Sequence, residues 1–409
     1  MGYVKDLKLA QEAAGFHYLG AEEACPGCIA NECLAARVAD AATPGDCDFC
    51  GAMNTTTVAL HDLFALMATS IRHEYEPSST SDQVPVGSDR DLEMPTLDGA
   101  KLLDQLGNPL GHERLAEVFA ESFEEVVDAE HWTGTLDERL VWGWQHFADE
   151  LRSRTRFVFW RTPRSGGAGP VDIEPADMLD ELEQVIRTAG LIIPFPKGQA
   201  CFRGRKHAPH KVLATPQQLG PPPAHDAVSM RMSPPGIPMF YGATNEATAL
   251  AELRGVAGEV ATVGEWITVR DCHIVDFVRL PTIPSIFCHE EVPRRPYLRF
   301  VQRFVEEITR PVLAHDHPSI DYVPTQAVAD YIRHCVKTDL GGPIDGVLYP
   351  SAMHAAGSNI AFFVSPEDLA GRSPLLALVE LPKRHVAKGM TTTWKESALP
   401  EDSGSSALN

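Results

Sequence analysis

The stretch Pro238-Met-Phe-Tyr-Gly-Ala-Thr-Asn-Glu-Ala-Thr-Ala-Leu-Ala-Glu-Leu-Arg254 is the most informative part of this chain. A short apolar run ends at Tyr241, a polar turn follows, and a helical pattern of Ala and Leu brings Glu252 onto an apolar face. An acid within an apolar stripe needs a reason, because burying an unpaired charge costs free energy. The pattern therefore predicts a functional carboxylate at Glu252, and the alternative is a solvated glutamate on a helix surface.

Four further motifs flank this stretch. In chain order they are Cys201-Phe-Arg-Gly-Arg205, Tyr322-Val-Pro-Thr-Gln326, Asp345-Gly-Val-Leu-Tyr-Pro-Ser351 and Ser358-Asn-Ile-Ala-Phe-Phe363. Taken together, over roughly residues 190 to 385, the five motifs resemble a RES domain. That family is named for its arginine, glutamate and serine, is similar to the ADP-ribosyltransferases, and consumes NAD.

The resemblance implies catalytic roles for Arg203, Tyr241, Glu252 and Ser351. Arg203 would grip the dinucleotide phosphates with its paired donors, and Tyr241 would stack on the nicotinamide ring. Glu252 would hold the ribose hydroxyl, and Ser351 would bond the nicotinamide ribose or a neighbouring phosphate. The chemistry agrees for Glu252, because cleaving the nicotinamide bond builds positive charge on the ribose. A core aromatic is the alternative for Tyr241.

Arg205, Arg231 and Asn359 are further candidates for binding the dinucleotide. If the segment is a strand, Arg205 points the same way as Arg203, and the spacing does not choose between them. Arg231 aligns with a family arginine and is a candidate second phosphate contact. Asn359, like Gln326, has a structural amide as its alternative. The chain has no dinucleotide-binding G-x-G-x-x-G or P-loop motif, so NAD is expected as a substrate and not as a hydride carrier.

The composition is ordinary for a soluble protein, but the charge is unevenly placed. The chain has 409 residues, 44% hydrophobic and 22% charged, which is enough for two or three domains. Residues 1–150 hold 8 Lys and Arg against 28 Asp and Glu, nearly all of the net charge of −21. General binding to nucleic acid is therefore unexpected for that half. No apolar run reaches the ~20 residues that span a bilayer and no signal-peptide pattern opens the chain, so a cytoplasmic protein without a membrane partner is expected.

The pattern along the chain predicts an α+β protein. An N-terminal zinc-binding and helical region precedes a mixed α/β domain that the resemblance likens to ADP-ribosyltransferases. The helical region is expected to include Thr55 to Met67, where apolar residues recur at helical spacing. The expected segments are a zinc-binding part at 1–55, a helical domain at 56–160, a linker with connecting helix at 161–190, the RES domain at 191–395 and a disordered tail at 396–409.

Two C-x2-C pairs, formed by Cys25 with Cys28 and Cys47 with Cys50, predict a structural zinc site. Four thiolates can surround one tetrahedral ion at about 2.3 Å and leave no open position for a catalytic water. The alternative is four buried or redox-active thiols. Cys33 is interpreted as a core or spare thiol. The other cysteines lack ligand spacing and are interpreted as buried apolar residues: Cys201, Cys272, Cys288 and Cys335.

The RES resemblance also implies a helical extension related to the HEPN group, whose ribonucleases use an arginine and a histidine on a helix. Arg139-Leu-Val-Trp-Gly-Trp-Gln-His146 has a fitting spacing. Leu140 stands where a polar residue is usual, and Trp142, Trp144 and Phe147 resemble core. A structural role for His146 is therefore favoured over catalysis.

These observations predict an NAD-degrading enzyme that breaks the nicotinamide N-glycosidic bond and uses water or phosphate as acceptor. In small bacterial relatives a protein with this activity is a toxin that an antitoxin inhibits, so an antitoxin or regulatory protein is a candidate partner. The alternatives are transfer of ADP-ribose to a macromolecule, a silent binding module, and HEPN-type ribonuclease activity in the N-terminal half. A Ser/His hydrolase is disfavoured because Ser351 lacks the G-x-S-x-G elbow.

Overall fold

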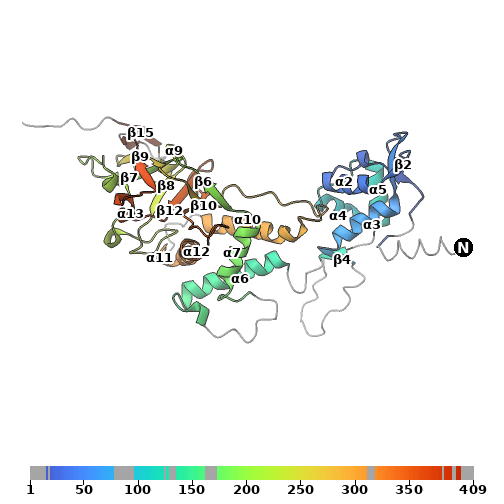
Figure 1. Ribbon diagram of the computed structural model, residues 1–409, viewed down its shortest axis with the longest axis horizontal. Helices are drawn as coiled ribbons and strands as arrows, with labels where there is room; N and C mark the ends of the chain where they lie inside the picture. Colours follow the sequence, from blue (N-terminus) through green and yellow to red (C-terminus); the bar gives the residue numbers. More distant parts are fainter. Residues whose placement is uncertain are drawn as a thin grey trace, which may run out of the picture. The chain divides into compact units, whose positions relative to one another are not determined.

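The computed structural model describes residues 15–16, 19–77, 96–123, 126–128, 135–161, 173–310, 318–379, 382–388 and 393–397 (Figure 1). The chain forms two compact units, the first comprising Met1–Leu136 with Thr282–Pro296 and the second Asp137–Pro281 with Tyr297–Asn409. The contacts thus divide the chain near residue 136, whereas composition places the main boundary near residue 161. Most of the expected linker, at 162–172, and the tail beyond residue 397 lie outside the described residues.

The first unit packs short helices and small antiparallel sheets around one apolar core. Strands β1, β3 and β2 form one sheet and β4 pairs with β5. Four phenylalanine rings, Phe16, Phe64, Phe119 and Phe123, meet at centroid distances of 4.9–5.9 Å within the core. The elements are β1 (Glu23–Ala24), η1 (Pro26–Cys28), α2 (Glu32–Ala41), β2 (Thr43–Gly45), β3 (Thr55–Ala59), α3 (Leu60–Ile71), β4 (Tyr75–Pro77), α4 (Gly99–Gln105), α5 (Glu113–Ser122), β5 (Val126–Asp128) and η5 (Val292–Arg294).

The helix expected from Thr55 is wrong in its first part. Residues Thr55–Ala59 form strand β3, and the helix begins only at Leu60. The strand contains three threonines and a valine, whose branched Cβ atoms favour extended backbone. It pairs with both β1 and β2, so sheet contacts outweigh the helical periodicity.

The second unit is built on a ten-stranded mixed sheet with the order β15-β14-β9-β7-β8-β12-β11-β10-β6, in which β13 also pairs with β9 (Figure 1). The pairings are antiparallel except for β10 with β11. The strands are β6 (Ile192–Phe195), β7 (Ala200–His207), β8 (Phe240–Ala243), β9 (Val260–Thr268), β10 (Cys272–Asp276), β11 (Gly346–Pro350), β12 (Ser358–Phe362), β13 (Leu376–Leu378), β14 (Lys383–Lys388) and β15 (Thr393–Glu396).

Side chains alternate between the two faces of this sheet, as a strand requires. Phe240 and Trp266 belong to the core on one face, whereas Ala243 and Val263 pack with helix α9 on the other. The helical elements are α6 (Leu136–Ser153), η3 (Phe159–Arg161), α7 (Met178–Thr188), α8 (Pro216–Leu219), η4 (Ala224–Asp226), α9 (Glu246–Glu252), α10 (Arg295–Thr309), α11 (Pro318–Asp321), α12 (Val323–His334) and α13 (Pro366–Ala370). Helices and mixed sheet together confirm the predicted α+β class.

Helix α9 is short and sharply delimited. The Asn245 side chain accepts a hydrogen bond from the Thr248 N–H at 2.8 Å and caps its start. Gly204 of β7 allows the helix to approach the strand, because a Cβ there would lie 2.8 Å from the Leu253 side chain. Arg254 then takes a positive φ of 46°, and the helix ends with Glu252 as its last residue. Local capping and close packing thus fix where this carboxylate emerges.

Candidate active site and metal centre

A cavity of about 340 Å³ opens where strands β7 and β8 part. The two strands pair only at Phe202 with Ala243, and beyond that point residues of both line the cavity. Its volume is within the usual range of small-molecule sites, about 300–1,000 Å³. Five of the residues predicted for the site lie on its wall: Arg203, Arg205, Tyr241, Glu252 and Asn359.

Glu252 is held through one of its two carboxylate oxygens. Its Oε1 accepts hydrogen bonds from Ser351 Oγ and from Asn359 Nδ2, each at 2.6 Å. No described residue is found to bond Oε2, although the side chain lines the cavity. The arrangement fixes the carboxylate and leaves one oxygen for a ligand.

Ser351 lies just beyond β11 and does not line the cavity itself. Its hydroxyl donates to Glu252 and accepts from the backbone N–H groups of Met353 at 3.2 Å and His354 at 3.1 Å. The sequence resemblance assigns this serine to the substrate, but the geometry gives it a direct contact with the glutamate. Asn359, on β12, makes the equivalent contact from the neighbouring strand.

Arg203 forms part of the cavity wall. Its Nη1 donates to the Tyr241 carbonyl at 2.5 Å and its guanidinium carbon lies 5.2 Å from the centre of the Phe240 ring. Its buried Nε finds no acceptor among the described residues. Burial lowers the pKa of Arg203 to about 10, with a further lowering from Arg205, so the group stays charged at neutral pH. A half-buried cation on the wall of a cavity suits an anionic ligand.

Arg205 follows on the same face of β7 and also lines the cavity, as the strand spacing predicts. Its Nη1 donates to the Gln218 carbonyl at 2.7 Å. Both arginines therefore have one backbone contact that orients the guanidinium. The contacts alone do not choose which of them would meet a phosphate.

Tyr241 turns its hydroxyl toward a loop and not into open space. The hydroxyl accepts a hydrogen bond from the Met232 N–H at 3.2 Å and shares one with Ser233 Oγ at 2.9 Å. Burial raises the pKa of Tyr241 to about 12, so the phenol is neutral. The tyrosine is thus a fixed wall of the cavity.

Arg231 is not on the cavity wall. Its guanidinium donates to the backbone carbonyls of Ile308 and Arg310, at the end of α10, and lies 5.1 Å from the centre of the Tyr322 ring. Gln326 makes no cavity contact either and donates to Ser229 Oγ, the Met230 carbonyl and the Ser233 carbonyl at 2.8–3.2 Å. Two predicted site motifs therefore meet at a loop whose residues Met230 and Ser233 form part of the cavity wall.

The sequence alone assigns no site role to Tyr349 or Ser233, although both lie within segments that carry the resemblance. Tyr349 lines the cavity beside Glu252, and burial, with the neighbouring Tyr241 and Glu252, raises its pKa well above the usual value. It stands within the quoted motif, two residues before Ser351, where strand alternation could have signalled it. Ser233 lies in a loop, and no spacing rule links it to Tyr241.

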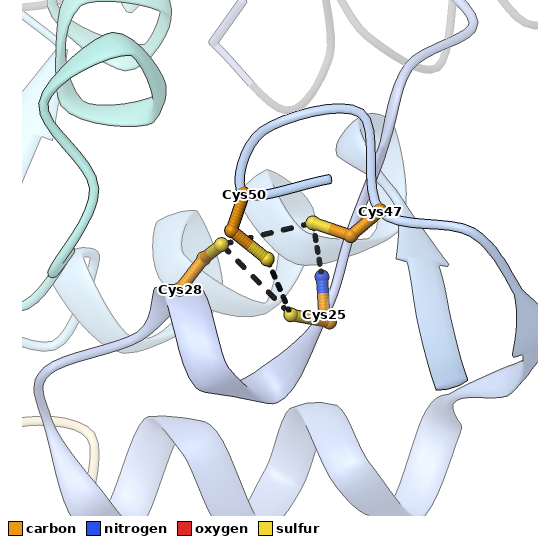
Figure 2. A group of neighbouring side chains, drawn as sticks. All are labelled: Cys25, Cys28, Cys47 and Cys50. Carbon is orange, nitrogen blue, oxygen red and sulfur yellow. Dashed lines mark hydrogen bonds between the residues drawn. The ribbon is translucent and has the colours of Figure 1, made fainter. Parts of the chain in front are cut away.

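The four predicted zinc ligands lie together in the first unit (Figure 2). Their Sγ atoms are all within 4.8 Å of one another. Neighbouring pairs are 3.5–3.9 Å apart, close to the ~3.8 Å expected between thiolates around tetrahedral zinc. This group can therefore hold a metal ion: Cys25, Cys28, Cys47 and Cys50.

The cluster also stabilises a thiolate. Burial alone would raise the pKa of Cys47, but backbone N–H groups of Cys50, Cys25 and Phe49 outweigh it and lower that pKa to about 6. The Cys25 N–H lies 3.3 Å from Cys47 Sγ. Desolvation and the neighbouring sulfurs instead raise the pKa of Cys28. Loading the cluster with metal would release protons from such thiols.

Three other cysteines differ from expectation. Cys33 and Cys288 form a disulfide across 255 residues of sequence, so neither is a spare or merely apolar thiol. Both belong to the first unit, where Ile286 and Phe287 join its core. Cys335 is exposed and not buried, whereas Cys201 and Cys272 are buried as predicted. A pairing across so many residues has no local signal in sequence.

The HEPN-like residues lie on α6. His146 is exposed, and Trp144 and Phe147 are buried as predicted. Trp142 is 43% exposed, so its interpretation as core is wrong. The helix turns it away from the face that carries Leu140 and Trp144.

The fold and site define a two-part protein, in which a cysteine-rich helical region precedes a mixed α/β domain whose cavity is lined by arginine, tyrosine and glutamate. Residues 202–382 match the RES domain model and residues 40–165 match the HEPN/RES N-terminal domain 1 model. The chain therefore contains a RES domain preceded by a HEPN-related N-terminal region. Neither curated proteins nor solved structures gave a significant match. No helix in the described part of the chain is long and apolar enough to cross a membrane.

Proposed function

We propose that this protein cleaves the nicotinamide N-glycosidic bond of NAD and passes the ADP-ribosyl group to water or inorganic phosphate. The RES domain suggests an NAD-acting, toxin-like protein. The observation that carries the specific proposal is the Glu252 carboxylate, fixed through one oxygen and facing a cavity that two arginines also line.

Glu252 would supply the electrostatic stabilisation. As the bond from ribose C1′ to nicotinamide breaks, its electron pair leaves with the nicotinamide and positive charge develops on the ribose. A carboxylate already held by Ser351 and Asn359 needs no reorganisation to face that charge. Ser351 and Asn359 thus act through Glu252 as positioning residues.

The arginines and the tyrosine would bind the rest of the dinucleotide. The Arg203 side chain lines the cavity, where its guanidinium can donate to a pyrophosphate oxygen, and Arg205 lies two residues further along β7. The Tyr241 ring forms part of the wall, where it can stack on nicotinamide. Water or phosphate then attacks that same anomeric carbon and loses a proton, and the products are nicotinamide and either ADP-ribose or ADP-ribose phosphorylated at that carbon.

The cysteine cluster would hold a structural zinc ion, with four thiolates and no position for a substrate. Zinc would stabilise the first unit without taking part in the chemistry of the second. A regulatory protein or antitoxin remains the proposed partner, with NAD as the small-molecule partner.

Replacing Glu252 by Gln tests the function. The amide keeps the size of the side chain but loses the charge, and the loss of one such contact costs roughly 10²- to 10³-fold in turnover. Nicotinamide release from NAD would be measured in water alone, with phosphate, and with added candidate proteins. Glu246→Gln is the matched control, since Glu246 begins the same helix but pairs with Lys383 and His385 outside the cavity wall.

A Glu252→Gln variant that turns over NAD within a few-fold of wild type would place the carboxylate elsewhere. Labelled ADP-ribose that appears mainly on protein would favour macromolecular transfer. A wild-type protein that releases no nicotinamide under any of the three conditions would remove the enzyme proposal.

A further inference from the structure

The hydroxyl of Tyr241 is held by the segment Ser229–Ser233, which we call the tyrosine loop. Ser233 Oγ lies 2.9 Å from the hydroxyl and the Met232 N–H donates to it at 3.2 Å. Ser233 and Met232 are only 2% and 3% exposed, so these contacts lie away from solvent. The position of the loop therefore controls the position of the tyrosine ring.

The loop is a tight turn closed by its own backbone. The Met230 N–H donates to the Ser233 carbonyl at 2.9 Å, and the Ser233 N–H donates back to the Met230 carbonyl at 3.3 Å. This pair of bonds is an isolated antiparallel bridge outside the main sheet. A turn with no neighbouring strand needs support from side chains to keep one position.

Helix α12 supplies the first support. Gln326 Nε2 donates to Ser229 Oγ at 3.0 Å, to the Met230 carbonyl at 2.8 Å and to the Ser233 carbonyl at 3.2 Å. Thr325 Oγ1 donates to the Arg231 carbonyl at 2.7 Å. Gln326 is 6% exposed, so these bonds form with little competition from water.

Arg231 supplies the second support, through its own side chain. Its two Nη groups donate to the Ile308 and Arg310 carbonyls, and its guanidinium stacks on Tyr322. Carbonyls at a helix end have no partner within the helix and carry partial negative charge, so they suit an arginine. These contacts engage the guanidinium away from the cavity wall.

We propose that Arg231 is a positioning residue that acts through the tyrosine loop and Ser233 on Tyr241, and is not a phosphate ligand. The inference rests on the proposed function for its catalytic consequence. Its structural consequence does not: loss of Arg231 should change the environment of the Tyr241 ring even without substrate.

The test compares Arg231→Met, Ser233→Ala and the double variant. Ser233→Ala removes one neutral hydrogen bond, so kcat for nicotinamide release should fall about 2- to 10-fold, and Arg231→Met should lose at least as much. Affinity for ADP-ribose should stay within about twofold of wild type in both. Because both residues act through one contact, the double variant should lose no more than the worse single variant.

Arg303→Met is the matched control, because Arg303 lies on α10 and pairs with Asp137, which Arg299 also binds. Arg231→Lys should recover part of the lost kcat, since lysine can still donate to a helix-end carbonyl. The Tyr241 ring signal in NMR spectra of tyrosine-labelled protein, assigned with Tyr241→Phe, should move in Arg231→Met and Ser233→Ala but not in Arg303→Met.

A tenfold or larger loss of ADP-ribose affinity in Arg231→Met, with kcat unchanged, would make Arg231 a phosphate ligand and overturn the proposal. Additive losses in the double variant would overturn it as well. If wild-type protein releases no nicotinamide, the proposed function fails and the NMR signal still decides the inference. If Arg231→Met does not fold, Ser233→Ala and Gln326→Leu carry the same comparison, and an unmoved Tyr241 signal in both would reject it.

Discussion

The four-cysteine cluster is built from residues close together in sequence, whereas the cavity around Glu252 is built from residues far apart in sequence. All four sulfurs come from residues 25–50, two from before helix α2 and two from the connection between strands β2 and β3. The cavity instead collects residues from β7, β8 and β12 and from the end of α9, with Ser351 following β11. Those four strands are consecutive neighbours in the sheet although their order in sequence differs.

This difference separates two kinds of site. In the cluster each sulfur faces the other three, so an ion bound by all four would have no open position, as in structural sites. In the cavity the second oxygen of Glu252 keeps unused bonding capacity and Arg203 places a cation on the wall, so the site can take a ligand. A closed site should control stability, whereas an open site should control binding.

The largest effect is expected from Cys47→Ser. Losing a ligand should remove the metal and unfold the region around β1 to β3, because structural zinc contributes on the order of 10 kcal/mol to such modules. Metal content and limited proteolysis would be measured, with nicotinamide release as the readout for the second unit. Cys335→Ser, at an exposed free thiol, is the control. One zinc per chain in Cys47→Ser would show that the cluster is not the metal site.

A smaller effect is expected for binding at the open site. Arg203→Ala should weaken a non-hydrolysable NAD analogue about 10- to 100-fold, because a hydrogen bond to a charged group contributes about 1.5–3 kcal/mol. Ser351→Ala should weaken binding of the analogue less, since the Ser351 hydroxyl donates its hydrogen bond to Glu252. Calorimetric titration would compare these variants with Arg205→Ala. Loss of binding only in Arg205→Ala would move the phosphate contact two positions along β7.

The smallest effect is expected for the pH dependence of stability, through His385, which lies beside Glu246 at the start of helix α9. His385 Nε2 lies 3.0 Å from Glu246 Oε1 without hydrogen-bond geometry, and burial lowers the pKa of His385 below its usual 6.5 despite that carboxylate. The unfolded chain therefore binds this proton more readily, so the contribution to stability is present above pH 6.5 and is lost as pH falls through the folded pKa.

Replacing His385 by Gln should flatten the decline of the melting temperature as the pH falls below 6.5. The difference between the two slopes should be the smallest of these effects, because the variant removes a single titrating group. Thermal melts of both proteins over that range would measure it. Equal slopes would mean that His385 does not contribute to the acid sensitivity.

Sequence by itself determined the features that depend on local spacing. Two C-x2-C pairs predicted which sulfurs would meet, because residues three apart on a tight turn can reach one point. Strand alternation predicted that Arg203 and Arg205 share a face, and an acid within an apolar helical stripe marked Glu252. The five motifs also predicted the family and the α+β class.

Only the tertiary structure decided the contacts between distant segments. It pairs Cys33 with Cys288 and makes Thr55–Ala59 a strand between two others. It also brings Ser351 and Asn359 into hydrogen bonds with Glu252. It also directed Arg231 to the end of α10. The physical reason is that strand order and helix packing set these distances, and a hydrogen bond depends on a few tenths of an ångström that residue spacing along a chain does not encode.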